Sequence, residues 1–157
     1  MPAGRERGSQ QRGRMTADQD PIRVARENID AFNAGDWQRV KATLAPDAVY
    51  DEVGTQRRLQ GADEIVQALQ GWKQAMPDAK GTITNAIASG NTVTQEITWE
   101  GTQTGPLMGP GGSLPASGKR QVTRAAWIAT IQGDRIKESR HYFDMMSLLQ
   151  QIGAAPQ

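Results

Sequence analysis

The sequence predicts an α+β domain in which N-terminal helices wrap a cone-shaped, curved antiparallel β-sheet that holds a deep pocket. In the first half of the chain, apolar residues recur at helical spacing and are interrupted by Gly and Pro. In the second half, the period changes to two, and segments rich in Thr, Val and Ile are separated by turn residues. A chain of 157 residues with this order of elements can pack its helices over one sheet face around a single core.

Three helices are predicted before the main sheet. The first ends at Gly35, and Asp36 is the expected N-cap of a second, short helix that Pro46 closes. Gly61 leads the third helix, which Pro77 ends. The apolar stripes of the three helices are, in turn, Ile22, Ala25, Ile29 and Phe32; Trp37, Val40 and Leu44; and Ile65, Leu69, Trp72 and Met76.

The remaining elements are strands and one closing helix. Residues 47–53 are expected to form a strand between the second and third helices. Four more strands form an antiparallel meander, with tight turns at Gly90-Asn91 and Gly133-Asp134. Their ranges are 82–88, 92–102, 121–131 and 135–143, and an apolar helix over 145–151 follows them. The long Gly- and Pro-rich loop over 105–118 is expected to be a lid over the cavity mouth, a plain connection or the cover of a dimer surface.

The composition excludes several classes of function. The chain has no cysteine and one histidine, which excludes thiol chemistry and multi-His metal sites. The net charge of +1 does not indicate nucleic-acid binding, and no apolar run is long enough to span a membrane, so we expect a soluble, cytoplasmic protein without either partner. Residues 1–20 hold four arginines and almost nothing apolar; we expect a disordered tail, solvated rather than bound to RNA, ahead of one domain over 21–153.

The most informative segment is the end of the last predicted strand. His141 is the only histidine, and Asp144 follows it at the junction with the closing helix. Asp144 is interpreted either as a general acid/base in an apolar cavity, moving a proton on carbon next to a carbonyl, or as the N-cap of that helix. Position alone favours the cap. His141 either orients Asp144, acts as a base near neutral pH, or is a structural donor.

Aromatic side chains are the candidates for a pocket wall. The four tryptophans either line a pocket for a flat, apolar ligand or belong to the core. They are Trp37, Trp72, Trp99 and Trp127. The residues assigned to substrate binding are Trp37, Trp99 and Trp127 from this group, with Tyr50, Gln103 and Tyr142.

Six segments that occur in order between Ile22 and Gly153 point to a known family. They are Phe32-Asn33-Ala34-Gly35-Asp36-Trp37, Pro46-Asp47-Ala48-Val49-Tyr50, Met76-Pro77-Asp78, the run from Trp99 to Leu107, Ser117-Gly118-Lys119 and the end segment His141-Tyr142-Phe143-Asp144. Together they resemble the SnoaL-like polyketide (ester) cyclase family of the nuclear transport factor 2-like superfamily, which also contains ketosteroid isomerase. The resemblance implies a curved-sheet cone with a deep pocket, a homodimer, and no metal or organic cofactor. It also implies that Asp144 is the general acid/base of an intramolecular aldol closure.

One position departs from the family pattern and leaves two hypotheses. Many relatives read Gly-Thr-His-Thr-Gly where this chain has Gln103, which does not titrate near neutral pH. In the enzyme hypothesis, Asp144 abstracts a proton, and Gln103, Tyr142 or a backbone amide stabilises the enolate oxygen. In the competing hypothesis, the chain is a non-catalytic, dimeric protein that binds a small apolar ligand.

Overall fold

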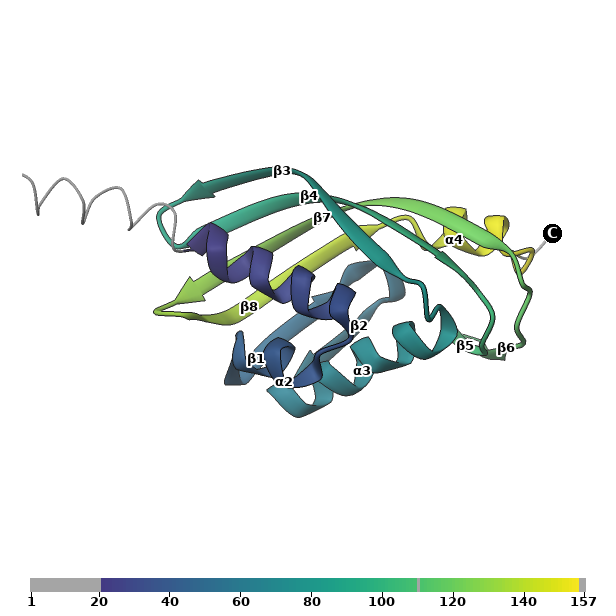
Figure 1. Ribbon diagram of the computed structural model, residues 1–157, viewed down its shortest axis with the longest axis horizontal. Helices are drawn as coiled ribbons and strands as arrows, with labels where there is room; N and C mark the ends of the chain where they lie inside the picture. The colour runs from purple at the N-terminus through teal and green to yellow at the C-terminus, as the bar shows by residue number, and fades with distance from the viewer. Residues whose placement is uncertain (1–20, 110, 156–157) are drawn as a thin grey trace, which may run out of the picture.

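The chain folds around one mixed, six-stranded sheet. The structure is a computed structural model and describes residues 21–109 and 111–155, so the tail predicted over residues 1–20 lies outside the described part. The strand order is β2-β1-β8-β7-β4-β3, and all neighbours are antiparallel except β1 and β8, which are parallel. The predicted α+β fold with a curved sheet is confirmed (Figure 1).

Helices cover one face of the sheet along most of its length (Figure 1). They are the N-terminal helix, which runs to residue 34, α2 (Trp37–Ala42) and α3 (Ala62–Ala75). The short helix α4 (Met145–Gln151) instead packs against β7. The predicted stop at Gly35 is confirmed by its left-handed φ of 66°, and Asp36 caps α2 by accepting the Arg39 amide at 3.2 Å.

The second helix is shorter than the sequence pattern predicted. Leu44 and Pro46 belong to strand β1 (Leu44–Glu52), and the helix ends at Ala42. The reason is tertiary, because the Thr43 carbonyl accepts the Ile136 amide at 2.7 Å and begins the pairing of β1 with β8. Pro46 is tolerated in the strand since it lies between Leu44 and Val49, where the register shifts and no ladder hydrogen bond is needed from its nitrogen.

The predicted four-stranded meander is confirmed. It consists of β3 (Lys80–Ser89), β4 (Thr92–Thr102), β7 (Arg120–Gln132) and β8 (Arg135–Phe143). Gly90 and Gly133 occupy the two tight turns with φ of 59° and 65°, a region in which other residues are strained. A short 3-10 turn, η1 (Val53–Thr55), and strand β2 (Arg57–Gln60) were not predicted; among the described strands, β2 pairs only with β1.

The Gly- and Pro-rich loop contains structure of its own. Strands β5 (Leu107–Gly109) and β6 (Gly112–Leu114) form a separate two-stranded hairpin within it. Leu107 is buried against the core, and the Gly105 amide donates to the Ala75 carbonyl at the end of α3. The hairpin is therefore attached to α3 on the helical side of the sheet.

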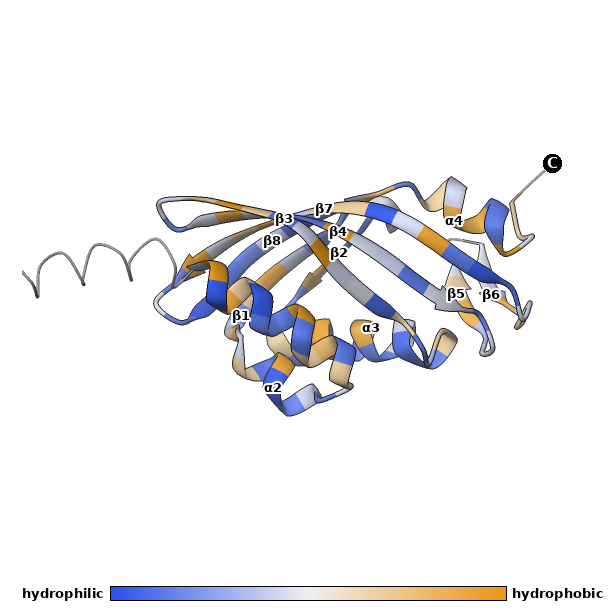
Figure 2. Ribbon diagram, turned by 45° about the horizontal axis from the view of Figure 1, so that its top comes forward, coloured by the Kyte–Doolittle hydropathy of each residue, from blue (hydrophilic) through white to orange (hydrophobic). Residues whose placement is uncertain are grey.

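Alternation along the strands decides which side chains face the helices. Figure 2 shows hydrophobic and hydrophilic residues alternating along the sheet, and on β4 the alternate residues Val93, Gln95 and Ile97 are buried. The strand registers then align one inward row across four strands. Its members are Glu52, His141, Trp127 and Gln95, each paired with the next. The row places the single histidine beside a buried carboxylate.

Candidate functional site

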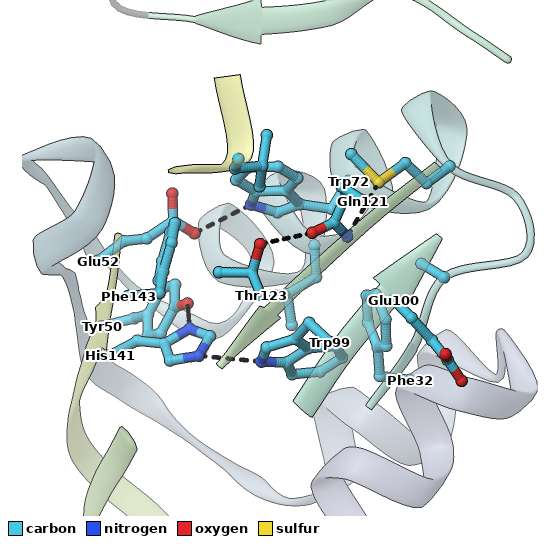
Figure 3. Close-up of a pocket in the computed structure, with 14 residues that line it drawn as sticks. Phe32, Tyr50, Glu52, Trp72, Trp99, Glu100, Gln121, Thr123, His141 and Phe143 are labelled. Atoms are coloured by element: carbon cyan, nitrogen blue, oxygen red, sulfur yellow. Dashed lines mark hydrogen bonds between the residues drawn. The ribbon is translucent and has the colours of Figure 1, made fainter. Parts of the chain in front are cut away.

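A cavity opens between the inner face of the sheet, helix α3 and the N-terminal helix. Its volume is about 570 Å³, which includes the space open to solvent at its mouth. The wall is mostly apolar, with a few polar side chains from β1, β4, β7 and β8 (Figure 3). The lining residues are Phe32, Tyr50, Glu52, Leu69, Trp72, Met76, Ala79, Trp99, Glu100, Gln121, Thr123, His141, Phe143 and Leu148. Such a cavity suits a small apolar ligand that is oriented by a few polar contacts.

His141 is held between two aromatic side chains in this wall. The Trp99 indole N–H donates to His141 Nε2 at 3.1 Å, and the Tyr50 hydroxyl lies 2.7 Å from His141 Nδ1. Because Nε2 accepts a hydrogen bond, the proton of a neutral imidazole is on Nδ1, which donates it to the Tyr50 oxygen. The Tyr50 hydroxyl proton is then free to be donated onward, to a carboxylate or to a ligand oxygen.

Glu52 is a buried carboxylate at the end of β1. Its side chain is 1% exposed, and Oε1 accepts from the Thr55 hydroxyl and from Arg57 Nε at 2.8 Å. The other oxygen, Oε2, accepts the Trp72 indole N–H at 3.1 Å. These donors come from η1, β2 and α3, so the turn after β1 and the helix above it fix the orientation of the carboxylate.

Burial sets the protonation of the two central groups. It lowers the pKa of His141 to about 4, and the Glu52 carboxylate opposes this only in part. Burial also raises the pKa of Tyr50 well above its usual value, and the charge of Glu52 adds to this effect. At neutral pH the site therefore contains a neutral imidazole and a protonated phenol.

The structure brings three of the residues predicted for the site into the cavity. They are His141, Tyr50 and Trp99, and His141 is hydrogen-bonded to each of the other two. Trp127 lines an adjacent cavity that shares these three residues with the first. Trp37 does not line either cavity; it packs edge-to-face on Phe32, with ring centroids 5.9 Å apart.

Asp144 is placed at the cap of the last helix and not in the cavity. Its side chain is exposed, and Oδ1 accepts the Ser147 amide at 3.1 Å, which is the N-cap alternative of the sequence analysis. Its neighbour Phe143 does line the cavity, whereas Tyr142 is 42% exposed and lies outside it. The predicted catalytic pair Asp144 and His141 is therefore not brought together.

Gln103 forms hydrogen bonds with the loop that contains the β5–β6 hairpin, and it does not line the cavity. Its side chain is 1% exposed, donates to the Pro115 carbonyl at 3.1 Å and accepts the Ser117 amide at 3.2 Å. Its backbone pairs with Lys119 and Gly118. The amide satisfies one acceptor and one donor of the loop, a task that suits the two-sided hydrogen bonding of glutamine.

Five polar lining residues were not assigned to the site from the sequence. They are Glu52, Trp72, Glu100, Gln121 and Thr123. A signal was present for three of them: Glu52 alternates with Ala48 and Tyr50 on β1, and Gln121 and Thr123 alternate with Ala125 and Trp127 on β7.

Two further properties follow from the described residues. Over residues 21–109 and 111–155, no three His, Asp or Glu side chains are grouped so as to hold a metal ion. Within the same ranges, no helix is both long enough and apolar enough to cross a membrane.

The fold and the cavity define a class of protein, namely α+β domains that enclose a pocket between a strongly curved sheet and the helices on its inner face. The chain belongs to the SnoaL-like polyketide cyclase family, whose model matches residues 22–152. This confirms the family and the fold that the sequence segments indicated.

Solved structures share the fold at low sequence identity. A protein from Jannaschia sp. CCS1, assigned as a SnoaL-like polyketide cyclase, is 17% identical with a TM-score of 0.79, over 89% of this chain and 96% of that one. IdmH from Streptomyces antibioticus, assigned as a polyketide cyclase, is 23% identical with a TM-score of 0.73, over 85% and 98%. An LEH-like epoxide hydrolase from M. tuberculosis is 21% identical with a TM-score of 0.67, over 86% and 90%. A search of curated proteins found no match.

Proposed function

We propose that this chain is a cofactor-independent enzyme that takes a small apolar carbonyl compound into the cavity and moves a proton on it, as a cyclase or an isomerase does. One observation carries the proposal: a carboxylate, Glu52, and a donor pair, Tyr50 and His141, lie together in the wall of a mostly apolar cavity. Low-dielectric surroundings strengthen such polar contacts, and few donors suffice to orient a carbonyl.

The chemistry needs a base and an oxyanion donor. A base removes a proton from the carbon next to the carbonyl, and the C–H electron pair forms the C=C bond of an enolate whose charge rests on oxygen. In an isomerase, the proton returns to another carbon; in a cyclase, the enolate carbon bonds to a second carbonyl carbon, and the resulting alkoxide takes up the proton. Tyr50 is the donor to the enolate oxygen, because its raised pKa keeps the hydroxyl protonated. His141 donates a hydrogen bond to the same hydroxyl oxygen and so holds it in position.

Two carboxylates are candidates for the base. Glu52 is already in the cavity wall, and its Oε2 accepts the Trp72 indole N–H. Asp144 is the candidate that the sequence resemblance indicates, and it must leave the Ser147 amide before it can reach a ligand. The geometry favours Glu52.

The test is exchange of the α-protons of 2-tetralone in D₂O, followed by proton NMR. We expect exchange faster than in buffer, a loss of about 10²-fold or more in Glu52→Gln, and a loss of about 10²-fold in Tyr50→Phe. Glu100→Gln is the matched control, since Glu100 also lines the cavity but is ion-paired to Arg120 at its exposed edge. Full exchange in Glu52→Gln with no exchange in Asp144→Asn would show that Asp144, and not Glu52, is the general base.

A non-catalytic ligand-binding protein is the second candidate function. The observation that favours it is the exposed, helix-capping position of Asp144 beside a mostly apolar cavity. Saturable binding of 2-tetralone without any exchange above the buffer rate would support this candidate and reject the enzyme.

We also propose that the chain forms a homodimer, as the family resemblance implies. Val122, Tyr142 and Met146 are large apolar side chains that are 41%, 42% and 48% exposed on β7, β8 and α4. Sedimentation velocity would test this, and a single monomeric species at micromolar concentration would reject it. A cytoplasmic location stays a prediction of the sequence.

A further inference from the structure

A second polar group lies in the cavity, beyond Trp99 from His141. Gln121 and Thr123 alternate on the inner face at the start of β7, and both line the cavity (Figure 3). Trp127, the cross-strand partner of His141, is six residues further along the same strand. The side chains are closer than the backbone positions, because Thr123 is the cross-strand partner of Trp99, whose indole donates to His141. Gln121 is the next inward residue beyond Thr123, so it can contact a different part of the same bound molecule.

The hydrogen bonds of Gln121 and Thr123 leave one N–H donor without a strong acceptor. The Thr123 hydroxyl donates to Gln121 Oε1 at 2.6 Å, which uses the acceptor of the amide. The amide nitrogen has two N–H groups, and the partner described for it is the thioether sulfur of Met76 at 3.5 Å. A thioether is a weak acceptor, so at least one N–H group has no oxygen or nitrogen acceptor within residues 21–109 and 111–155.

The position of the amide makes this donor significant. Gln121 is only 3% exposed and Thr123 only 4%, so bulk water does not satisfy the spare N–H group. Such a group favours a ligand that brings an acceptor, because pairing removes the cost of leaving a buried donor unsatisfied. If the amide were turned over, the Thr123 hydroxyl would become the spare donor, so the pair offers a donor in either orientation.

We infer that Gln121, positioned by Thr123, is a second binding site in the cavity for a hydrogen-bond-accepting oxygen of the ligand, separate from the carbonyl at Tyr50. The inference rests on the proposed function for the first carbonyl and deepens it, since it makes the ligand an apolar molecule with a second acceptor oxygen. It also assigns to Gln121 a role in specificity.

The test compares two synthetic probes that differ in one atom's chemistry. In 6-acetyl-2-tetralone, a second carbonyl oxygen lies far from the ring ketone, and in 6-isopropyl-2-tetralone that oxygen is absent. Dissociation constants are measured by quenching of tryptophan fluorescence, because Trp72 and Trp99 line the cavity. We expect the acetyl probe to bind about fivefold to tenfold more tightly to the wild-type chain.

The variants separate this site from the protein's other buried amides. Gln121→Met should remove the preference for the acetyl probe and change the affinity for the isopropyl probe less than about twofold. Gln95→Met is the matched control, since Gln95 is also a buried inward glutamine but does not line the cavity, and it should keep the preference. A preference that survives in Gln121→Met would overturn the inference.

A measurement on the wild-type chain keeps the inference testable if Gln121→Met does not fold. The infrared stretch of a ¹³C-labelled acetyl carbonyl should move to lower wavenumber on binding, and an unshifted or raised stretch would overturn the inference. The two proposals fail separately. Equal affinities with rapid α-proton exchange would reject the role of Gln121 alone, whereas a clear acetyl preference without exchange would reject the enzyme and keep this binding site.

Discussion

Titration of the single histidine is the most direct test of the site. His141 has a pKa of about 4 in the folded chain because it is buried, whereas an unfolded chain holds histidine near its usual value of about 6.5. The unfolded state therefore binds a proton first as the pH falls, and the stability supplied by the neutral, buried imidazole is lost between these two values. It is fully present above about pH 6.5.

The size of the effect follows from the difference between the two pKa values. Between about pH 7.5 and about pH 4.5, His141 should contribute a loss of about 2–3 kcal/mol to the free energy of unfolding. Other groups titrate in this range, so the quantity to measure is the difference between the wild-type chain and His141→Gln. Glutamine does not titrate but still offers a donor and an acceptor to Tyr50 and Trp99.

Two assays check this prediction. Urea unfolding of both chains at the two pH values gives the double difference in stability, and proton NMR of the histidine Hε1 gives the pKa directly, without assignment, because the chain has one histidine. An Hε1 titration near pH 6.5, with parallel stability curves for the two chains, would refute the buried, neutral imidazole and the hydrogen-bond roles deduced for Tyr50 and Trp99.

Three further changes test other parts of the structure. Gln95→Met should raise the free energy of unfolding, measured by urea denaturation, by about 1–3 kcal/mol. The reason is that neither polar atom of this fully buried amide has a hydrogen-bond partner among the described residues. A loss of stability would show that the amide does form hydrogen bonds. Asp144→Ala should lower the melting stability by about 0.5–2 kcal/mol, since it removes the cap on the Ser147 amide, and an unchanged midpoint in calorimetry would contradict that cap. Gly81→Ala should lower the free energy of unfolding by about 1–3 kcal/mol and raise the titration midpoint of the His141 Hε1 signal. The reason is that a Cβ at this position would lie 2.6 Å from the Trp99 ring, which is hydrogen-bonded to His141. A variant with the wild-type titration would show that the position of the Trp99 ring does not depend on the space at Gly81.

Local chemistry made much of the fold predictable from the sequence. The stops and turns at Gly35, Gly90 and Gly133 need left-handed backbone, and glycine is the residue that adopts it without strain. Tight turns join β3 to β4 and β7 to β8, so alternation and turn residues were sufficient to predict these two pairings, while β4 and β7 pair across the long loop.

The elements that were missed depend on contacts between distant segments. Residues 44–46 have the spacing of a helix end, but pairing with β8 makes them a strand. Strand β2 has four residues and one neighbour, too little to leave a pattern of its own. Tertiary pairing overrides local preference in both cases.

The site was predictable in part, for the same reason. His141, Tyr50 and Trp99 were assigned from residue type and family resemblance, and the structure brings them together. Asp144 was ambiguous, because one aspartate at a strand-to-helix junction has the right chemistry for a cap and for catalysis. Glu52 was missed because its role depends on donors from three other segments, which only the folded chain assembles.

The parallel pairing of β1 with β8 has a consequence for how the protein is made. The hydrogen bond between Tyr50 and His141 joins residues 91 positions apart, and that between Trp99 and His141 joins residues 42 apart. Contacts of such long range form slowly, since loop-closure entropy must be overcome before they contribute. A chain still emerging from the ribosome can pair β3 with β4 early, yet its cavity has no wall on one side until the last strand has been synthesised and inserted beside the first. Chains that stop before β8 should therefore expose the apolar cavity lining and aggregate, and competence to bind a ligand should appear only near the end of synthesis.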